Sequence, residues 1–207
     1  MSITLILIIV TCLISYQALN NPGLFQRLKH TPYLVHRDKE YYRFLSSGFV
    51  HADWMHLIIN MYVLYSFGEF VEHKFVFYFG PLMGRLNFLL LYLLTLTVSD
   101  IPSYLKHKDN PHFSSVGASG AISGILFVFV LFQPWSILLL FFIIPIPAIF
   151  AAVLYLVYSS WASRRGKDFI NHDAHFYGAV FGLLIALGMK PSLFEVFWDR
   201  LLHDLPF

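Results

Sequence analysis

Long apolar stretches alternate with shorter polar segments along this chain of 207 residues. No Lys, Arg, Asp or Glu occurs in residues 1–26, 110–163 or 174–189. The helices of a large soluble core keep a polar face toward water, and these stretches have none. Apolar stretches of this length without charge predict transmembrane helices, and the predicted fold class is an all-α membrane protein.

We predict six membrane-spanning helices in a single membrane domain that covers residues 1–207. The charge-free block 110–163 is too long for one crossing, because about 20 helical residues suffice. Proline disfavours helix at the residue before it, so Gln133-Pro134 divides the block, and Pro145 and Pro147 are expected to kink the later helix. The predicted spans are approximately residues 3–19, 54–71, 83–99, 115–132, 135–158 and 173–189.

Composition indicates the lipid bilayer as the surroundings of this chain. Hydrophobic residues make up 57% of the chain and charged residues 13%, about half the charged share of a soluble domain. The net charge of +2, without any basic run, argues against nucleic acid. The single cysteine, Cys12, forms no disulfide framework. The first apolar stretch lacks the basic start and the Ala-x-Ala site of a signal peptide, so we expect a retained helix.

Polar side chains inside apolar spans are costly, so each one is a candidate for function. His56 and Asn60 lie four residues apart, hence on one helix face, near the start of the second span. Ser119 and His175 lie near the starts of the fourth and sixth spans. Each of these three spans follows an odd-numbered loop, so we expect all four side chains near the same face of the membrane.

Small residues predict how Ser119 and His175 come together. Ser119 lies in the run GASGAISG, and the sixth span has Gly178 and Gly182 at G-x-x-x-G spacing. Small residues let helices approach closely in lipid. We therefore expect the serine hydroxyl and the imidazole within hydrogen-bond reach, about 2.6–3.2 Å, where the imidazole can take the serine proton near neutral pH.

Acyl transfer also needs hydrogen-bond donors for the oxyanion that develops on the substrate carbonyl. The ring of His56 and the side-chain amide of Asn60 are suitable donors. The backbone N–H of Ser119 is a third candidate, because N–H groups in the first turn of a helix lack helical partners.

Taken together, these motifs resemble the rhomboid family of intramembrane serine proteases. The resemblance rests on His51-x4-His56-x3-Asn60, Gly117-Ala118-Ser119-Gly120 and Ala174-His175-x-x-Gly178, with Tyr42-Arg43 and Gly68-x3-Glu72 as further features. It covers nearly the whole chain after the first span. It implies a six-helix rhomboid-like bundle that hydrolyses peptide bonds in or near the transmembrane helices of other membrane proteins. It implies neither a metal nor a cofactor, and we expect a bacterial inner membrane as its location.

The resemblance also implies a role for each matching residue. Ser119 is expected to be the nucleophile, and His175 the general base, of a dyad without an acidic third member. His56 and Asn60 are expected to form the oxyanion hole with the Ser119 N–H. The residues expected to be structural are Arg43, His51, Glu72, Gly117, Gly120 and Gly178.

Two features depart from the family pattern. Many members carry an aromatic residue four positions after the nucleophile, packed on the base imidazole, whereas this chain has Ser123 there. The sequence therefore leaves open what holds the ring of His175. In addition, ten of the fourteen Lys and Arg lie in the odd loops, which the positive-inside rule places in the cytoplasm. The best-known bacterial relatives open the site to the outside, and we favour that family topology.

Three alternatives compete with a protease. His172 and His175 resemble a metal pair, but there is no H-E-x-x-H motif, and no carboxylate in another span obviously completes a site. A catalytically inactive relative that binds transmembrane helices would share the fold, although inactive relatives usually lack the serine or the histidine. A small transporter would place its polar residues near mid-span within inverted halves, and the sequence has no such repeat.

Overall fold

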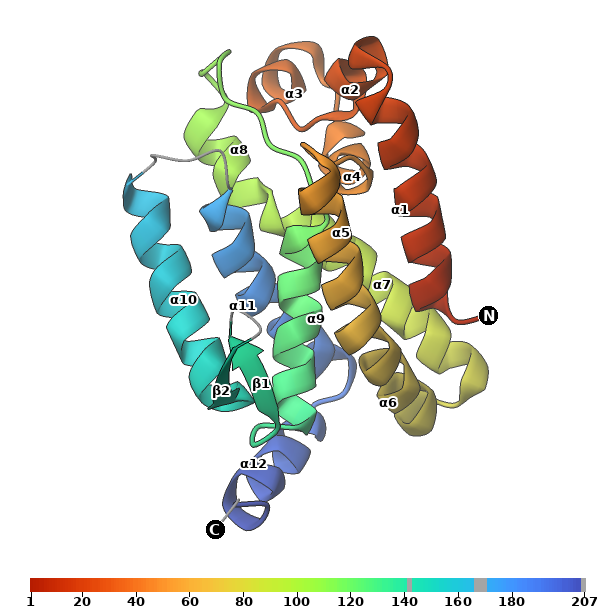
Figure 1. The fold of residues 1–207 in the computed structure, drawn as a ribbon, viewed down its shortest axis with the longest axis vertical. Helices are drawn as coiled ribbons and strands as arrows, with labels where there is room; N and C mark the ends of the chain where they lie inside the picture. Colours follow the sequence, from red (N-terminus) through yellow and green to blue (C-terminus); the bar gives the residue numbers. More distant parts are fainter. Residues whose placement is uncertain (141–142, 166–170, 206–207) are drawn as a thin grey trace.

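The structure is a computed structural model that describes residues 1–140, 143–165 and 171–205. Figure 1 shows a bundle of helices with one short β-hairpin. The elements are α1 (Ile3–Leu19), α2 (Pro22–Leu28), α3 (Pro32–Asp38), α4 (Arg43–Ser46), η1 (Ser47–Phe49), α5 (Trp54–Val63), η2 (Leu64–Gly68), α6 (Glu69–Phe79), α7 (Pro81–Ser99), α8 (Ile101–His107), α9 (Ser119–Phe132), β1 (Ile137–Leu140), β2 (Ile144–Pro147), α10 (Ala148–Arg165), α11 (His172–Met189) and α12 (Leu193–His203).

Short polar side chains begin several of the helices. Asp53 accepts a hydrogen bond from the His56 N–H at the start of α5, and Asn171 accepts one from the Ala174 N–H at the start of α11. Such caps satisfy backbone donors that have no partner within the helix. Local sequence therefore fixes where the two helices that carry His56 and His175 begin.

Most of the predicted helices are present with shifted ends. α1 covers the residues of the first predicted span, and α7, α9 and α11 correspond to the third, fourth and sixth. The second is longer than predicted, because α5 continues through a π-helical turn, η2, into α6 as far as Phe79. The long first loop contains the short helices α2, α3 and α4. The sequence analysis did not predict α12, which turns by 112° from α11.

The predicted fifth span is wrong over its first half. β1 and β2 form an antiparallel hairpin in which Leu138 lies opposite Ile146, and α10 begins only at Ala148. Pro145 and Pro147 lie in β2 and do not kink a helix. Proline removes a helix hydrogen bond, whereas the outer edge of a strand tolerates it. The chain is still mostly helical, as the predicted all-α fold class requires, and the hairpin is a local exception to it.

Length and hydropathy identify fewer candidate spans than the sequence pattern predicts. Among the described residues, one continuous helical stretch, Pro81–His107, is long and apolar enough to cross a bilayer. The bent pair α11 and α12 gives a second candidate if it is counted as one span, and α1 and α9 are apolar but shorter. The count of six crossings is therefore not established by this measure.

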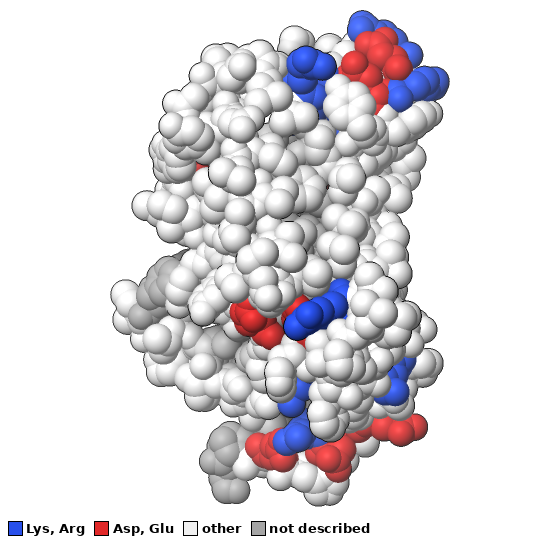
Figure 2. Space-filling view, turned by 90° about the vertical axis from the view of Figure 1, so that its right-hand side faces the viewer, with Lys and Arg blue, Asp and Glu red and all other residues white. Residues whose placement is uncertain are grey.

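Charged groups occupy separate levels of the surface. Figure 2 shows Lys, Arg, Asp and Glu at the upper end of one face and again toward its lower part, with a broad, nearly charge-free band between them. Large apolar side chains are exposed on the helices, among them Leu13, Ile58 and Val157. An exposed apolar belt between charged levels is the surface expected of a protein that contacts lipid.

α9 forms the centre of the bundle. Of its 14 residues, 12 are buried, and α5–α6 and α10 lie on opposite sides of it in Figure 1. Glycines set its distance from α11. A Cβ added at Gly178 would lie 2.1 Å from the carbonyl oxygen of Gly120, and one added at Gly182 would lie 2.4 Å from the Cα of Gly124. The two backbones are therefore in direct contact, as the small-residue pattern predicts.

Candidate active site

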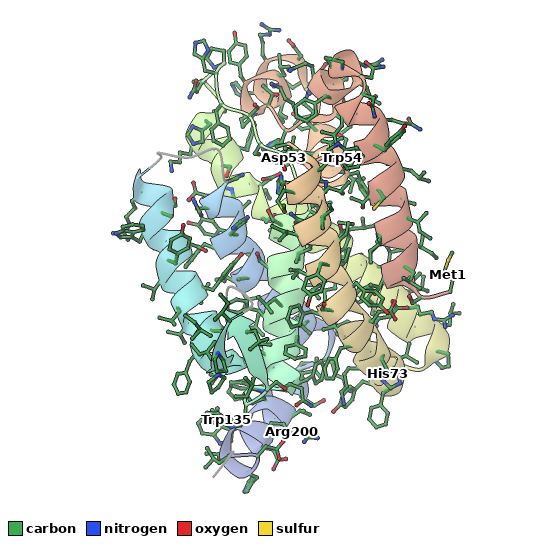
Figure 3. All side chains as sticks on the ribbon, in the orientation of Figure 1. Met1, Asp53, Trp54, His73, Trp135 and Arg200 are labelled. Carbon is green, nitrogen blue, oxygen red and sulfur yellow. The ribbon has the colours of Figure 1, made fainter. Side chains whose placement is uncertain are left out.

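A cavity of about 610 Å³ lies between α5, α9, α10 and α11. It is lined by the four polar residues expected at the site, His56, Asn60, Ser119 and His175, and also by Ser123 and Tyr155. Asp53 lines it too, and Figure 3 places Asp53 at the upper end of α5, with His73 far below it on α6. The polar residues therefore gather toward one end of the bundle, as the span count predicts.

Ser119 and His175 are in hydrogen-bond contact. The Nε2 atom of His175 lies 2.8 Å from the Oγ atom of Ser119. Ser119 is the first residue of α9, and His175 lies in the first turn of α11, so the close packing of the two backbones brings these ends together. A neutral imidazole with its proton on Nδ1 presents the free Nε2 electron pair to the serine hydroxyl.

His56 and Asn60 share one face of α5. The Asn60 side-chain amide donates to the His56 carbonyl at 2.8 Å, and the Ala52 N–H donates to His56 Nδ1 at 3.4 Å. The first bond fixes which way the Asn60 side chain turns, and its amide has a second N–H. Together with the backbone N–H at the start of α9, the two side chains on α5 offer hydrogen-bond donors around the same cavity.

The segment before Ser119 is anchored to the first loop. His30 and Ser115 exchange two backbone hydrogen bonds of 3.0 Å, and the Gly117 N–H donates to the Ser47 carbonyl at 2.9 Å. Gly117 has a φ of +113°, and a Cβ there would lie 2.7 Å from the ring of His56. Only glycine meets both conditions, so Gly117 lets the chain pass close to His56 just before Ser119.

His51 lies behind the site and does not line the cavity. It is fully buried, with Nδ1 2.9 Å from the Ser15 hydroxyl and Nε2 accepting a longer, 3.5 Å bond from the Ala118 N–H. Burial, with a smaller effect from His56, lowers the pKa of His51 to about 3. A neutral His51 therefore joins α1 to the residue that precedes Ser119.

Arg43 and Glu72 are buried away from the cavity, where each joins separate segments. Arg43 Nη1 donates to the carbonyls of Gln26 and Lys29 at 3.0 and 2.8 Å, which closes the first loop. The Glu72 carboxylate accepts from the backbone N–H groups of Ile3 and Thr4 at 2.9 and 2.8 Å. A carboxylate at a helix N-terminus also interacts favourably with the helix dipole, so Glu72 ties α6 to the start of α1.

The sequence analysis missed Tyr155, which places an aromatic ring beside the imidazole of His175. The Tyr155 ring lies nearly parallel to that of His175, with an interplanar angle of 14° and centroids 6.1 Å apart. Its hydroxyl is 2.5 Å from the hydroxyl of Ser123. The one available signal was a tyrosine in an otherwise apolar stretch, and the sequence did not show which way it faced.

The chain matches the profile of the Rhomboid domain family over residues 38–192. It belongs to the rhomboid family. The match covers all the residues that line the cavity, and membership makes this rhomboid an integral membrane protein of a family that acts on membrane-protein substrates within the bilayer.

Similar rhomboids come from plants and animals. Rhomboid-like protein 11, chloroplastic, of Arabidopsis thaliana is 31% identical over 161 residues, which cover 74% of this chain and 54% of the relative. RHOMBOID-like protein 12, mitochondrial, from the same plant is 27% identical, with 65% and 42% covered. Presenilin-associated rhomboid-like protein, mitochondrial, of Homo sapiens is 30% identical, with 67% and 35% covered. The chain thus spans about half of the first relative and about a third of the human one.

Proposed function

We propose that this rhomboid is an intramembrane serine endopeptidase, which hydrolyses peptide bonds in or near the transmembrane helices of other membrane proteins. The observation that carries the proposal is the 2.8 Å contact between Ser119 Oγ and His175 Nε2. It is supported by the position of His56 and Asn60 on the wall of the same cavity, which offers a binding place for the scissile peptide.

In the proposed reaction, Ser119 Oγ attacks the substrate carbonyl carbon while His175 Nε2 takes the hydroxyl proton. The oxyanion that forms accepts hydrogen bonds from His56, the Asn60 amide and the Ser119 N–H. His175 then gives its proton to the leaving amine, and water, activated by the same imidazole, releases the acyl group from Ser119. Each step uses groups of the chain itself.

The length of α9 supports a reaction below the membrane surface. Its 14 residues extend over about 21 Å, whereas the hydrocarbon core is about 30 Å thick. A helix this short cannot reach both surfaces of the bilayer, and in the proposal its Ser119 end is the one that lies below the surface. We include in the proposal six crossings, formed by α1, α5–α6, α7, α9, α10 and α11, in a bacterial inner membrane with both chain ends in the cytoplasm.

The proposed substrate is a membrane-spanning helix that unwinds easily and has small residues at the scissile bond. A regular helix holds each carbonyl in a hydrogen bond to the N–H four residues later, so the carbonyl must leave this ladder before Ser119 can attack it. The cavity, bordered by Ile59 and Ile122 as well as the polar residues, accepts an apolar segment of this kind.

A catalytically inactive rhomboid that binds transmembrane helices is the second candidate. The same cavity would serve it, but binding alone does not require a serine hydroxyl within hydrogen-bond reach of an imidazole. This observation favours the protease.

Cleavage of a generic transmembrane reporter in liposomes tests the proposal. Ser119→Ala and His175→Ala should each lower kcat/KM by about 10³-fold or more, because the nucleophile and its base act as one unit. Ser66→Ala and His73→Ala make the same chemical changes outside the cavity and should cleave as fast as wild type. Wild type should also react with a serine-directed fluorophosphonate at Ser119. Cleavage by Ser119→Ala at the wild-type rate would overturn the dyad. A folded wild type that neither cleaves nor reacts would favour the inactive helix-binding protein.

A further inference from the structure

Helix α10 is connected to the pair Ser119 and His175 through Tyr155. Besides lying nearly parallel to the ring of His175, Tyr155 contacts Ser123, whose hydroxyl donates to the Ser119 carbonyl at 2.7 Å. A serine hydroxyl has one proton, so the 2.5 Å bond between Tyr155 and Ser123 must use the tyrosine proton. A directed chain of hydrogen bonds therefore runs from α10 to the carbonyl of the nucleophile.

We propose that Tyr155 is the positioning residue for His175, and that it makes the dyad competent only while α10 is seated against α9 and α11. The proposal rests on the function proposed above. The side chain of Ser123 is too small to pack on the imidazole. It leaves room for the ring of Tyr155 and accepts a hydrogen bond from the Tyr155 hydroxyl. The aromatic support of the base thus comes from a different helix than the nucleophile.

Neighbouring contacts support the same role for α10. Tyr158, one turn further along α10, packs edge-on against His172 with ring centroids 5.6 Å apart. The His172 ring in turn packs edge-on against His175 at 5.8 Å. The hydroxyl of Ser163 donates to the carboxylate of Asp173 on α11. Side chains of α10 therefore meet the first turn of α11 at His172 and Asp173, while Tyr155 lies beside His175 itself and reaches Ser119 only through Ser123.

The position of Tyr155 links substrate binding to the state of the base. Tyr155 lines the cavity between α5 and α10, so a substrate segment in that cavity lies against the residue that supports His175. If α10 moved away from α9, the parallel ring contact and the bond to Ser123 would be lost together. On this proposal a bound substrate is cleaved only while α10 holds Tyr155 against His175, since Ser119 needs an oriented base.

Substitutions that move the aromatic ring from α10 to α9 test this inference. Tyr155→Ala should lower kcat about 10- to 100-fold with KM changed less than threefold, because a misplaced base slows the chemical step. Tyr155→Phe keeps the ring and should stay within about fivefold of wild type. The double variant Ser123→Phe with Tyr155→Ala returns an aromatic side chain from α9, and should recover at least tenfold over Tyr155→Ala. Tyr65→Ala, an exposed tyrosine on η2, is the matched control and should leave kcat unchanged.

The order of the His175 ring gives a readout that does not depend on activity. Carbon-13 relaxation of labelled histidine should show a more mobile His175 ring in Tyr155→Ala than in wild type, and an ordered ring again in the double variant. An active wild type with Tyr155→Ala at full kcat, or a His175 ring equally ordered in both, would overturn the inference. Failure of the proposed function would look different, because wild type itself would then neither cleave nor react at Ser119, while the ring mobility would still decide the role of Tyr155.

Discussion

The two sides of α9 hold the site in different ways. Toward α11, glycine backbones touch, and a methyl group added at Gly178 would lie 2.1 Å from a carbonyl oxygen. Toward α10, the contact depends on side chains, namely the Tyr155 hydroxyl on Ser123 and the Tyr155 ring beside His175. We call these the glycine side and the tyrosine side. Backbone contact leaves no freedom to slide, whereas a side-chain contact can open and close.

The difference separates two requirements of a serine–histidine pair. The glycine side sets the distance between Ser119 and His175, because it fixes the backbones of α9 and α11. The tyrosine side orients the imidazole. A membrane protease that must admit a helix and still keep its dyad intact can move the second side without disturbing the first.

The largest expected effect comes from filling the glycine side. Gly178→Val places a branched side chain against the Gly120 carbonyl and should force α9 and α11 apart. Overpacking at a backbone contact should cost about 3 kcal/mol or more of folding stability and abolish cleavage. Thermal unfolding in detergent, together with the reporter assay, measures both.

Gly188 provides the control on the same helix. A Cβ at Gly188 would meet nothing within 4 Å, so Gly188→Ala should fold and cleave normally, with a small gain in stability from helix propensity. If Gly178→Val were as stable and active as wild type, the glycine side would not be the rigid one, and the comparison would fail.

An intermediate effect is expected from acid, which acts on neither side of α9 but on His51, the residue that joins α1 to Ala118 just before α9. The folded pKa of His51 is about 3, below the value of about 6.5 for an unfolded histidine. Between these values the unfolded chain binds a proton that the folded chain does not, so stability is lost as the pH falls below about 6.5. At pH 5 the loss from this group is about 2 kcal/mol.

His51→Gln isolates this contribution, because every other titrating group remains. The difference in unfolding free energy between pH 7.5 and pH 5 should be about 2 kcal/mol smaller in the variant than in wild type. Equal pH dependence in both proteins would mean that His51 is not held neutral behind the site.

The smallest expected effect is on the tyrosine side, away from the dyad. Ser163→Ala removes the hydrogen bond from α10 to the Asp173 carboxylate, which should cost about 1 kcal/mol of stability. Cleavage should stay within a few-fold of wild type, because Tyr155 still supports the base. Ser160→Ala, on the same helix, serves as the matched change. A loss as large as that of Gly178→Val would show that both sides of α9 are equally rigid.

Sequence patterns were informative where one chain segment determines its own structure. The charge-free stretches predicted the positions of α1, α9 and α11, an apolar run after Arg85 predicted that of α7, and the small residues predicted the close packing that brings Ser119 to His175. The catalytic roles of these residues stay predictions. The hairpin before α10 was missed, because an apolar run of this length fits a membrane helix as well as a buried strand.

Because the hairpin was predicted as helix, the contact of Tyr155 with the site could not be predicted either. A helix begun at residue 135 and kinked at Pro145 does not predict which residues of the later turns face α9. The actual helix begins at Ala148, and its rotation is set by contacts with α9 and α11 that no local pattern records. The conformation of the first loop could not be predicted in detail either. Arg43 holds it by hydrogen bonds to backbone carbonyls, and every residue has such a carbonyl, so the sequence does not show which ones are bound.

The hairpin has a consequence for the solubility of the chain during assembly. The Ala148 N–H donates to the Ser136 carbonyl, so the even-numbered residues of β2 direct their N–H groups toward β1. The odd-numbered ones, Pro145 and Pro147, face outward, and proline has no N–H. The outer edge of β2 therefore offers no amide proton at Pro145 and Pro147 to a strand from another molecule, so these two positions cannot donate hydrogen bonds to an intermolecular sheet.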